Sequence, residues 1–228
     1  MKLIAIIPAR GGSKRIPRKN IKDFLGKPII AYSIEAALKS KLFSEVMVST
    51  DDLEITEVAK RYGASIPFMR SASASDDSAT TSDALIDVFN TYTKQGKDFD
   101  YACCIYPTAP FITSEKLIEA YNKLTKERLN VVFPVMKFAY PIWRSLKKEN
   151  GKLLMNWPEH LNSRSQDLPP SYHDAGQFYF FRVDTFLEEK TLFGSNSGGI
   201  VIDELHGHDI DNDTDWRLAE LKYKLLVC

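Results

Sequence analysis

Residues 7–20, IPARGGSKRIPRKN, decide how the rest of the chain is interpreted, because they follow directly on the apolar run 2–7. A continuous apolar run of this length predicts a buried β-strand, and the two glycines after it predict a loop at the carboxyl end of that strand. Ligands of open α/β sheets bind at this end of the strands. The segment therefore predicts an α/β fold with a ligand site in its first loop.

The first loop combines two features that suit a bound polyphosphate. Gly11 and Gly12 let backbone N–H groups approach a ligand, and successive N–H groups form a concave anion site. The same loop carries five cations, which are Arg10, Lys14, Arg15, Arg18 and Lys19. It matches neither GxxxxGK[ST] nor GxGxxG, which excludes a Walker A loop and a dinucleotide loop. A solvated basic loop is the alternative, but its position after a strand favours a phosphate site.

The bulk composition limits the class of protein. The chain has 228 residues, 44% of them hydrophobic, which is enough for one large core. Thirty basic residues balance thirty acidic ones, so we expect neither a nucleic-acid partner nor binding to a membrane. Cys103 and Cys104 lie in an apolar run and are interpreted as core residues of a reduced protein. With no signal segment and no apolar run near 20 residues, the sequence predicts a soluble cytoplasmic protein.

Strand-like runs alternate with helical spacing through the first 135 residues. Strands are expected at residues 2–7, 45–49, 66–69, 101–105 and 130–134. Helices are expected at residues 28–39, 53–62, 81–93 and 114–126. Two later strands, 177–182 and 199–205, precede a closing helix at 216–227. This alternation predicts βαβ units, and hence a Rossmann-like, mainly parallel sheet with helices on both faces. No linker-like segment divides the chain, so we expect one domain over residues 1–228.

The segment at about 138–170 differs in character from the rest. Residues 143–157 are interpreted as a hairpin that turns at Asn150-Gly151 and carries Trp143 and Trp157 at its ends. An exposed aromatic hairpin outside the main sheet suits contact with a second subunit, and a surface flap is the alternative. We therefore expect a protruding hairpin that forms a homodimer.

An acidic run before the last helix is the second candidate for chemistry. Asp209 and Asp211 are two residues apart, so in an extended segment their carboxylates share a face, as in sites that hold Mg²⁺ together with substrate phosphates. Residues 209–220 partly imitate an EF-hand loop, but Thr214 replaces the required glycine. Helix capping by Asp213 or Asp215 is a further interpretation, and it leaves Asp209 and Asp211 unexplained.

With these two sites identified, the chain resembles the cytidylyltransferases that activate sugar acids, above all the nine-carbon nonulosonates. The resemblance spans nearly the whole chain. It rests on blocks in the family's order, which are IPARGGSKRIPRKN at 7–20, STDD at 49–52, residues 70–82, YPTAP at 106–110, RSQDLP at 164–169 with Gly176 and Tyr179, and DID at 209–211. It implies a nucleotide-diphospho-sugar transferase type of fold, dimerisation through a protruding segment, and the coupling of CTP to a sugar acid with release of pyrophosphate.

The resemblance also implies roles for individual residues. The implied nucleotide contacts are Arg10, Gly11, Gly12, Ser13, Lys14, Asn20, Arg70, Ser82, Pro107 and Thr108. The implied sugar contacts are Arg164, Gln166 and Tyr179, with the guanidinium of Arg164 matched to the carboxylate of the acid. Arg10, Lys14 and Asp211 are the catalytic candidates, and Asp209 and Asp211 hold Mg²⁺.

Two departures from the family pattern bear on the choice of sugar acid. Tyr106 stands where activators of sialic acid usually have glutamine, and Arg15 stands where they usually have glycine. Together with residues 172–177 these departures resemble the branch that activates pseudaminic acid. The alternatives are the same reaction on N-acetylneuraminic, legionaminic or ketodeoxyoctonic acid, and a non-catalytic nucleotide-binding domain.

Overall fold

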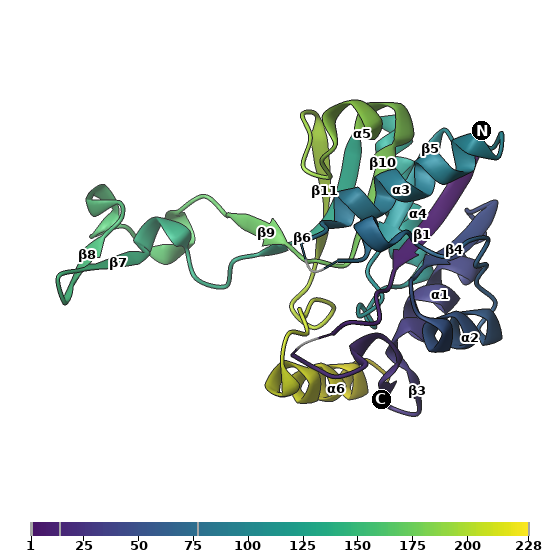
Figure 1. The fold of residues 1–228 in the computed structure, drawn as a ribbon. Coiled ribbons are helices and arrows are strands. Elements are labelled where there is room, and N and C mark those ends of the chain that lie inside the picture. Colours follow the sequence, from purple (N-terminus) through teal and green to yellow (C-terminus); the bar gives the residue numbers. More distant parts are fainter. Residues whose placement is uncertain (1, 14, 77, 228) are drawn as a thin grey trace.

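A seven-stranded sheet forms the centre of the protein, in a computed structural model that describes residues 2–13, 15–76 and 78–227 (Figure 1). Its strands are β1 (Leu3–Pro8), β4 (Glu45–Ser49), β5 (Tyr101–Ile105), β6 (Val131–Lys137), β9 (Tyr172–Asp174), β10 (Phe178–Arg182) and β11 (Ser197–Ile202). The order is β11-β6-β10-β5-β1-β4, with β9 paired to β6. Only β9 and β10 run antiparallel to their neighbours, so the predicted mainly parallel sheet is confirmed.

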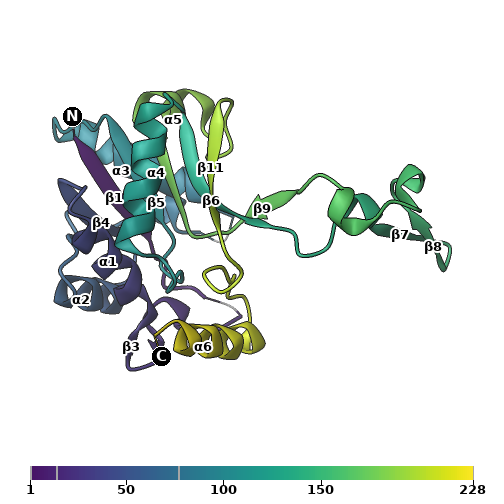
Figure 2. The same ribbon diagram turned by 180° about the vertical axis from the view of Figure 1, so that it is seen from behind.

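Helices cover both faces of the sheet, as predicted (Figures 1 and 2). One face carries α1 (Ile29–Ser40), α2 (Leu53–Arg61) and α4 (Ser114–Lys126), and the other carries α3 (Thr81–Lys94) and α5 (Val183–Glu189). Strand β1 shows why both faces are buried. Leu3, Ala5 and Ile7 pack in the core of the first face, whereas Ile4 and Ile6 pack in that of the second. A strand covered on both sides is apolar throughout, which is the pattern that revealed it in the sequence.

A third, smaller core joins the end of the chain to its first loop. The last helix, α6 (Asp213–Val227), packs on the short hairpin of β2 (Asp23–Phe24) and β3 (Lys27–Pro28). The ring of Phe24 lies 5.6 Å from that of Trp216, and Ile210 is buried in the same cluster as Ile16. This packing brings the acidic segment 209–211 beside the glycine-bearing loop, 190 residues away in the chain.

Some elements of the structure differ from the prediction. Residues 66–69 form no strand, and this part of the chain contributes only an isolated bridge between Met47 and Ser65. The last helix begins at Asp213 instead of residue 216. Helix α5 was not predicted because it has seven residues, fewer than the periodic pattern needs to stand out. Among the described residues, no helix combines the length and apolar character that crossing a bilayer requires.

The arm, residues 138–171, projects from the body on one side (Figures 1 and 2). A hydrogen bond from Phe138 N to Ser171 O, 2.9 Å long, closes its base. Within it, β7 (Leu146–Glu149) and β8 (Lys152–Met155) pair antiparallel. Asn150 and Gly151 connect them with φ values of 50° and 77°, as a two-residue turn with left-handed residues requires. The predicted protruding hairpin and its turn are confirmed.

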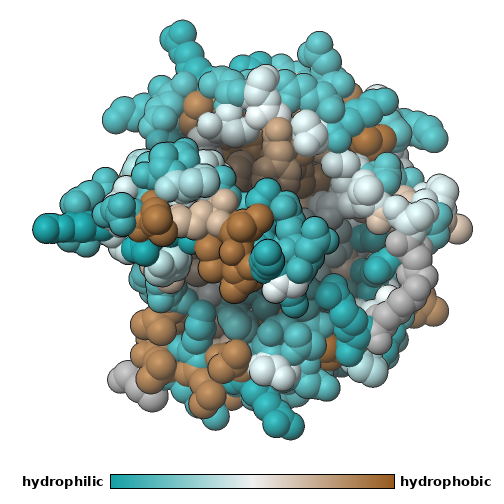
Figure 3. Space-filling view, turned by 90° about the vertical axis from the view of Figure 1, so that its left-hand side faces the viewer, coloured by the Kyte–Doolittle hydropathy of each residue, from teal (hydrophilic) through white to brown (hydrophobic). Residues whose placement is uncertain are grey.

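The predicted contact of the arm's tryptophans with a second subunit stays a prediction. The rings of Trp143 and Trp157 pack on each other at 5.4 Å, and Trp143 Nε1 donates to Pro169 O at 2.9 Å. Both indoles are half-buried, and their contact supports a hairpin that buries little apolar surface of its own. The exposed apolar side chains of the arm include four leucines, which are Leu146, Leu153, Leu154 and Leu161. Figure 3, with the arm toward the viewer, shows apolar surface there.

Candidate active site

A cavity of about 500 Å³ opens at the carboxyl ends of β1 and β5. From β1 the chain passes first to β4 on one side and later to β5 on the other, so the cavity lies at a topological switch point, where open α/β sheets bind ligands. The residues that line it are Pro8, Arg10, Ser13, Arg15, Ile16, Lys19, Asn20, Arg70, Ala74, Asp76, Ala79, Thr80, Thr81, Ala84, Tyr106, Pro107 and Thr108. The predicted place of the site, after the first strand, therefore contains a cavity.

Gly11 of the first loop serves the loop's own attachment. Gly11 N donates to Asp51 Oδ1 at 3.1 Å, and a Cβ added to Gly11 would lie 2.6 Å from Asp52 Oδ2. Glycine is required there because the loop passes close to the end of β4. Gly11 and Gly12 are not among the described residues that line the cavity, whereas Ser13 is. The expected anion site of successive N–H groups thus loses Gly11, whose N–H is already bonded to a carboxylate.

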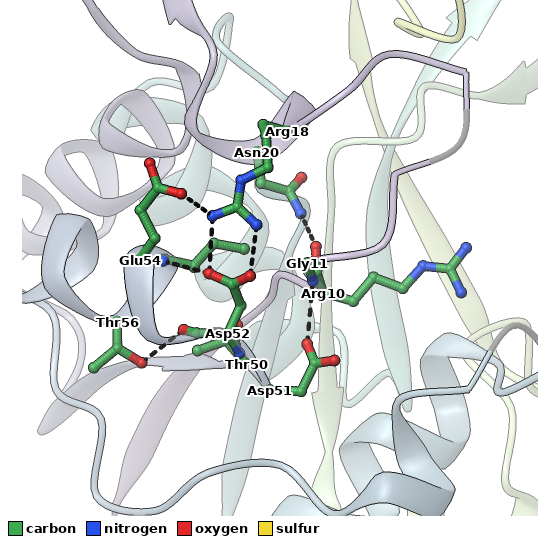
Figure 4. Close-up of polar contacts among 10 residues, drawn as sticks. Arg10, Gly11, Arg18, Asn20, Thr50, Asp51, Asp52, Glu54 and Thr56 are labelled. Atoms are coloured by element: carbon green, nitrogen blue, oxygen red, sulfur yellow. Dashed lines mark hydrogen bonds and ion pairs between the residues drawn. The ribbon is translucent and has the colours of Figure 1, made fainter.

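The cations of the loop divide into two groups. Arg10, Arg15 and Lys19 line the cavity, and burial lowers the pKa of Lys19. Arg18 instead donates to Asp52 and Glu54, and the hydrogen bond to Asp52 raises the pKa of its guanidinium (Figure 4). Lys14 lies outside the described residues. Among the described cations of the loop, Arg18 therefore binds carboxylates of the body and does not line the cavity.

Asn20 and Arg70 are buried polar residues in the cavity wall. Asn20 Nδ2 donates to Arg10 O at 2.9 Å, which fixes the backbone that carries the Arg10 side chain (Figure 4). Arg70 Nε donates to Ser49 Oγ at 3.0 Å, and its Nη2 donates to Ser49 O. Burial lowers the pKa of the Arg70 guanidinium. The structure thus brings both residues to the cavity, and their contacts with a nucleotide stay predictions.

The opposite wall comes from the loop after β5 and the start of α3. Pro107 and Thr108 line the cavity as expected, and Tyr106 lines it beside them. Ser82 is not among the described lining residues, because the start of α3 turns Thr80 and Thr81 toward the cavity. A capping box fixes that helix start, since Thr80 Oγ1 accepts from Asp83 N at 3.1 Å and Asp83 Oδ2 accepts from Thr80 N at 2.8 Å. The spacing of Thr80 and Asp83 in the sequence could have revealed this.

One chain does not bring the three predicted sugar contacts together. Tyr179 is 2% exposed on β10, where it donates to Asp174, and burial raises its pKa. The ring of Tyr106, 5.5 Å away, lies in the cavity wall in its place. Arg164 and Gln166 are exposed on the arm, which points away from the body (Figures 1 and 2). A common pocket of these three residues in one chain is therefore excluded.

Asp209 and Asp211 lie on either side of the buried Ile210, so both carboxylates project from the third core. Asp211 Oδ1 lies 2.8 Å from Arg15 Nη2 and 3.9 Å from Lys19 Nζ, and both of these cations line the cavity. In the described part of the chain, no cluster of three or more histidine, cysteine or acidic side chains could hold a metal. Two carboxylates fit Mg²⁺, which binds through one or two of them together with phosphates and water.

The other interpretations of the acidic run can now be decided. Asn212 Oδ1 accepts from Thr214 N at 2.9 Å and from Asp215 N at 3.1 Å, and Asp215 Oδ2 accepts from Asp211 N and Asn212 N. Asn212 therefore carries the helix cap, with Asp215 as its reciprocal partner, and capping by Asp213 is wrong. An EF-hand is excluded because Asp213 and the would-be final ligand Glu220 belong to the same helix, α6.

Comparison with known proteins extends over the whole chain. The family model for cytidylyltransferases matches residues 4–222. The chain is 46% identical to a pseudaminic acid cytidylyltransferase of Campylobacter jejuni subsp. jejuni serotype O:23/36 (strain 81-176), over 99% of this chain and 97% of that protein. It is 33% identical to a CMP-N,N'-diacetyllegionaminic acid synthase of Legionella pneumophila subsp. pneumophila (strain Philadelphia 1), over 96% of this chain and 95% of that protein.

Among solved structures, the chain is similar to a CMP:2-keto-3-deoxy-manno-octonic acid synthetase complexed with CTP. The TM-score is 0.71 at 19% sequence identity, and the match covers 100% of this chain and 99% of that one. At this identity the likeness concerns the fold alone.

Proposed function

The chain belongs to the cytidylyltransferase family, and we propose that it couples CTP to the nine-carbon 2-keto sugar acid pseudaminic acid, with release of pyrophosphate. The observation that carries the choice of acid is the 46% identity to a pseudaminic acid cytidylyltransferase over 99% of this chain. The cavity supports a nucleoside triphosphate because four cations among the described residues line it, which are Arg10, Arg15, Lys19 and Arg70. The cytoplasmic location expected from the sequence stays a prediction.

In this proposal the reaction depends on placing the α-phosphorus of CTP against the anomeric hydroxyl and on neutralising the departing pyrophosphate. Arg10 crosses from the first loop toward the residues before α3, where its Nη1 donates to Asp76 O at 3.3 Å, so its charge lies within the cavity. Arg10 and Lys14 would stabilise the triphosphate and pyrophosphate, and Ser13 would donate to a phosphate oxygen. Asn20, Arg70, Pro107 and Thr108 would contact the nucleoside.

Asp209 and Asp211 would hold Mg²⁺, which when bound shields the charge of the phosphates and aligns them. The contacts of Asp211 support this assignment, because Arg15 and Lys19 tie the carboxylate to the cavity that would receive the triphosphate. The two cations also neutralise Asp211 in the absence of the ion. Release of the carboxylate from Arg15 would free that guanidinium for the phosphates.

The sugar acid would be bound between two subunits of a homodimer. Arg164 and Gln166 lie on the arm, so they can reach a cavity like this one only in another copy of the chain (Figure 1). A guanidinium fork matches the carboxylate of the acid. Tyr106, and not the buried Tyr179, would face the acid from the cavity wall.

Pyrophosphate release, measured with a panel of nucleotides and a panel of acids, tests this proposal. We expect turnover with CTP well above that with UTP, ATP or GTP, and a higher kcat/KM for pseudaminic acid than for legionaminic, N-acetylneuraminic or ketodeoxyoctonic acid. Equal turnover of ATP and CTP would contradict the nucleotide assignment. A preference for another of these acids would establish the alternative substrate, and the absence of turnover with all of them would favour a binding domain.

A further inference from the structure

Two neighbouring aspartates, Asp51 and Asp52, hold the two ends of the glycine-bearing loop through their side chains. At its start, Gly11 N donates to Asp51 Oδ1 at 3.1 Å. At its end, the guanidinium of Arg18 binds Asp52 (Figure 4). Asp51 and Asp52 lie in the short connection between the end of β4 at Ser49 and the start of α2 at Leu53, so two elements of the body hold both attachment points. Ser13, Arg15 and Ile16 of the cavity wall lie between these points. Arg10, Lys19 and Asn20 of the wall lie just outside them.

The contact of Arg18 with Asp52 is bidentate. Arg18 Nη1 lies 2.5 Å from Asp52 Oδ2, and Arg18 Nη2 lies 2.9 Å from Asp52 Oδ1 and also donates to Glu54. Asp52 Oδ1 accepts in addition from Ile55 N at 2.9 Å and so caps α2. The side chains of Arg18 and Asp52 are 38% and 21% exposed, which means that water only partly screens the pair. The carboxylate of Asp52 therefore links the end of the loop to the start of α2.

The backbone of Arg18 shows what the attachment determines. Its φ of 55° is left-handed, a conformation that a residue with a Cβ adopts only when its surroundings require it. Its carbonyl accepts from Ile21 N and from Lys22 N, both at 3.0 Å. The turn formed in this way contains Lys19 and Asn20, which both line the cavity. Asn20 in turn holds the carbonyl of Arg10.

We propose that Arg18 is a positioning residue for the nucleotide: through Asp52 and Glu54 it fixes the turn that aims Lys19 at the cavity and, through Asn20, sets the backbone of Arg10. Arg18 itself makes no contact with the substrate. Its guanidinium pairs with carboxylates of the body, so among the described residues the cations available to a triphosphate are those in the cavity wall. This inference rests on the proposed use of CTP.

Substitutions of Arg18 can separate orientation from stability. Arg18→Asn removes the ion pair but keeps a residue that tolerates the left-handed conformation, whereas Arg18→Ala removes the pair and retains the unfavourable φ. Asp52→Asn removes the charge and keeps a good cap for α2. Arg182 and Asp184 provide a matched control, because Arg182 Nη2 lies 2.6 Å from Asp184 Oδ2 at the start of α5, outside the cavity. Asp184→Asn therefore loses a comparable ion pair without touching the loop.

The readouts are the Kd of CTP by calorimetry, the KM of each substrate and the Tm of each variant. We expect Arg18→Asn, Arg18→Ala and Asp52→Asn to raise the Kd and KM of CTP roughly tenfold, with the KM of the sugar acid within about twofold of wild type, because a misplaced charge acts on the nucleotide alone. Arg18→Asn should have a higher Tm than Arg18→Ala and the same loss of CTP affinity. Asp184→Asn should lower only the Tm.

The inference is overturned if the affinity for CTP follows the Tm across the four variants, or if Arg18→Asn binds CTP like the wild type. Failure of the proposed function looks different. In that case the wild-type protein would not turn over CTP with any acid. The Kd of CTP or pyrophosphate, measured by calorimetry for Arg18→Asn and for the wild type, would still show whether Arg18 orients the residues of the cavity.

Discussion

The body and the arm differ in how far contacts within one chain fix their polar side chains. Around the cavity, contacts within one chain fix the polar side chains: Asn20 to Arg10 O, Arg18 to Asp52, and Arg70 to Ser49. On the arm, Arg164 and Gln166 are exposed, and so are four leucines. We infer that the nucleotide side of the site is complete in a single chain, whereas the sugar side needs a second copy. Substitutions in the body and in the arm can test the two sides separately.

The largest effect is expected from Asp211→Asn in the body. If Asp211 holds Mg²⁺ beside the triphosphate, its loss should lower kcat by on the order of 10²–10³, the scale of a lost electrostatic contact to developing charge. Steady-state rates at saturating CTP and Mg²⁺ measure this, with circular dichroism as the check on folding. Asp213→Asn is the control, because Asp213 also pairs with a lysine, Lys22, at 3.2 Å, but this lysine, unlike the Arg15 and Lys19 partners of Asp211, is not among the described cavity residues.

Full activity of Asp211→Asn without added metal would contradict the assignment of the metal ligands. An equal loss in Asp213→Asn would show instead that neutralising any acidic residue near the start of α6 is harmful.

The next effect concerns the arm as a whole. Replacing residues 147–152 with a short turn removes the tip of the hairpin but leaves the pair of Trp143 and Trp157 in place. We expect weaker dimerisation, and a KM for the sugar acid raised at least tenfold while the KM for CTP changes little, because only the sugar side uses the second copy. Sedimentation and substrate kinetics measure the two effects. A monomeric variant with unchanged kinetics for both substrates would make the arm a surface flap.

A single residue of the arm should give a smaller and more specific effect. Leu153 is 65% exposed on β8 and shares a face of the hairpin with Leu146. Burial of one leucine contributes about 1.5 kcal/mol or more, so Leu153→Asp should weaken the dimer roughly tenfold or more. Leu187→Asp on α5, also exposed, is the control and should not change the dimer. If both substitutions weaken the dimer equally, the leucines of the arm are not its contact surface.

The body and the arm also differ in what the sequence could predict. The sheet and its helices followed from apolar periodicity, and the hairpin followed from Asn150-Gly151, because both signals are local. The partners of Arg18 and Gly11 could not be predicted, because their carboxylates lie 34 and 40 residues away and nothing local distinguishes a cation bound to Asp52 from one bound to phosphate. The resemblance to a family placed Arg10, Asn20 and Arg70 at the cavity, whereas the contacts that orient them required the fold.

The smallest expected effect concerns the ion pair of Arg18 and Asp52, which fixes the loop. This effect depends on pH. The hydrogen bond from Arg18 lowers the pKa of Asp52 from 3.8 to about 2. A folded-state pKa below the unfolded value contributes stability above about pH 4, and this contribution is lost as the pH falls through about 2. The shift corresponds to at most about 2.5 kcal/mol, which screening of this partly exposed pair reduces to about 1 kcal/mol.

Urea unfolding of the wild type and of Asp52→Asn between pH 2 and pH 7 measures this contribution. Because asparagine still caps α2, the difference in the free energy of unfolding should be about 1 kcal/mol at pH 7, shrink below pH 4 and vanish near pH 2. Asp184, whose pKa Arg182 also lowers to about 2, should give a profile of the same shape in Asp184→Asn, with a smaller amplitude because its side chain is 66% exposed. The two ion pairs would then share the direction of their pH dependence, and only the Asp52 variant should bind CTP more weakly. A difference that persists unchanged at pH 2 would show that Asp52 stabilises the protein through its cap and not through Arg18.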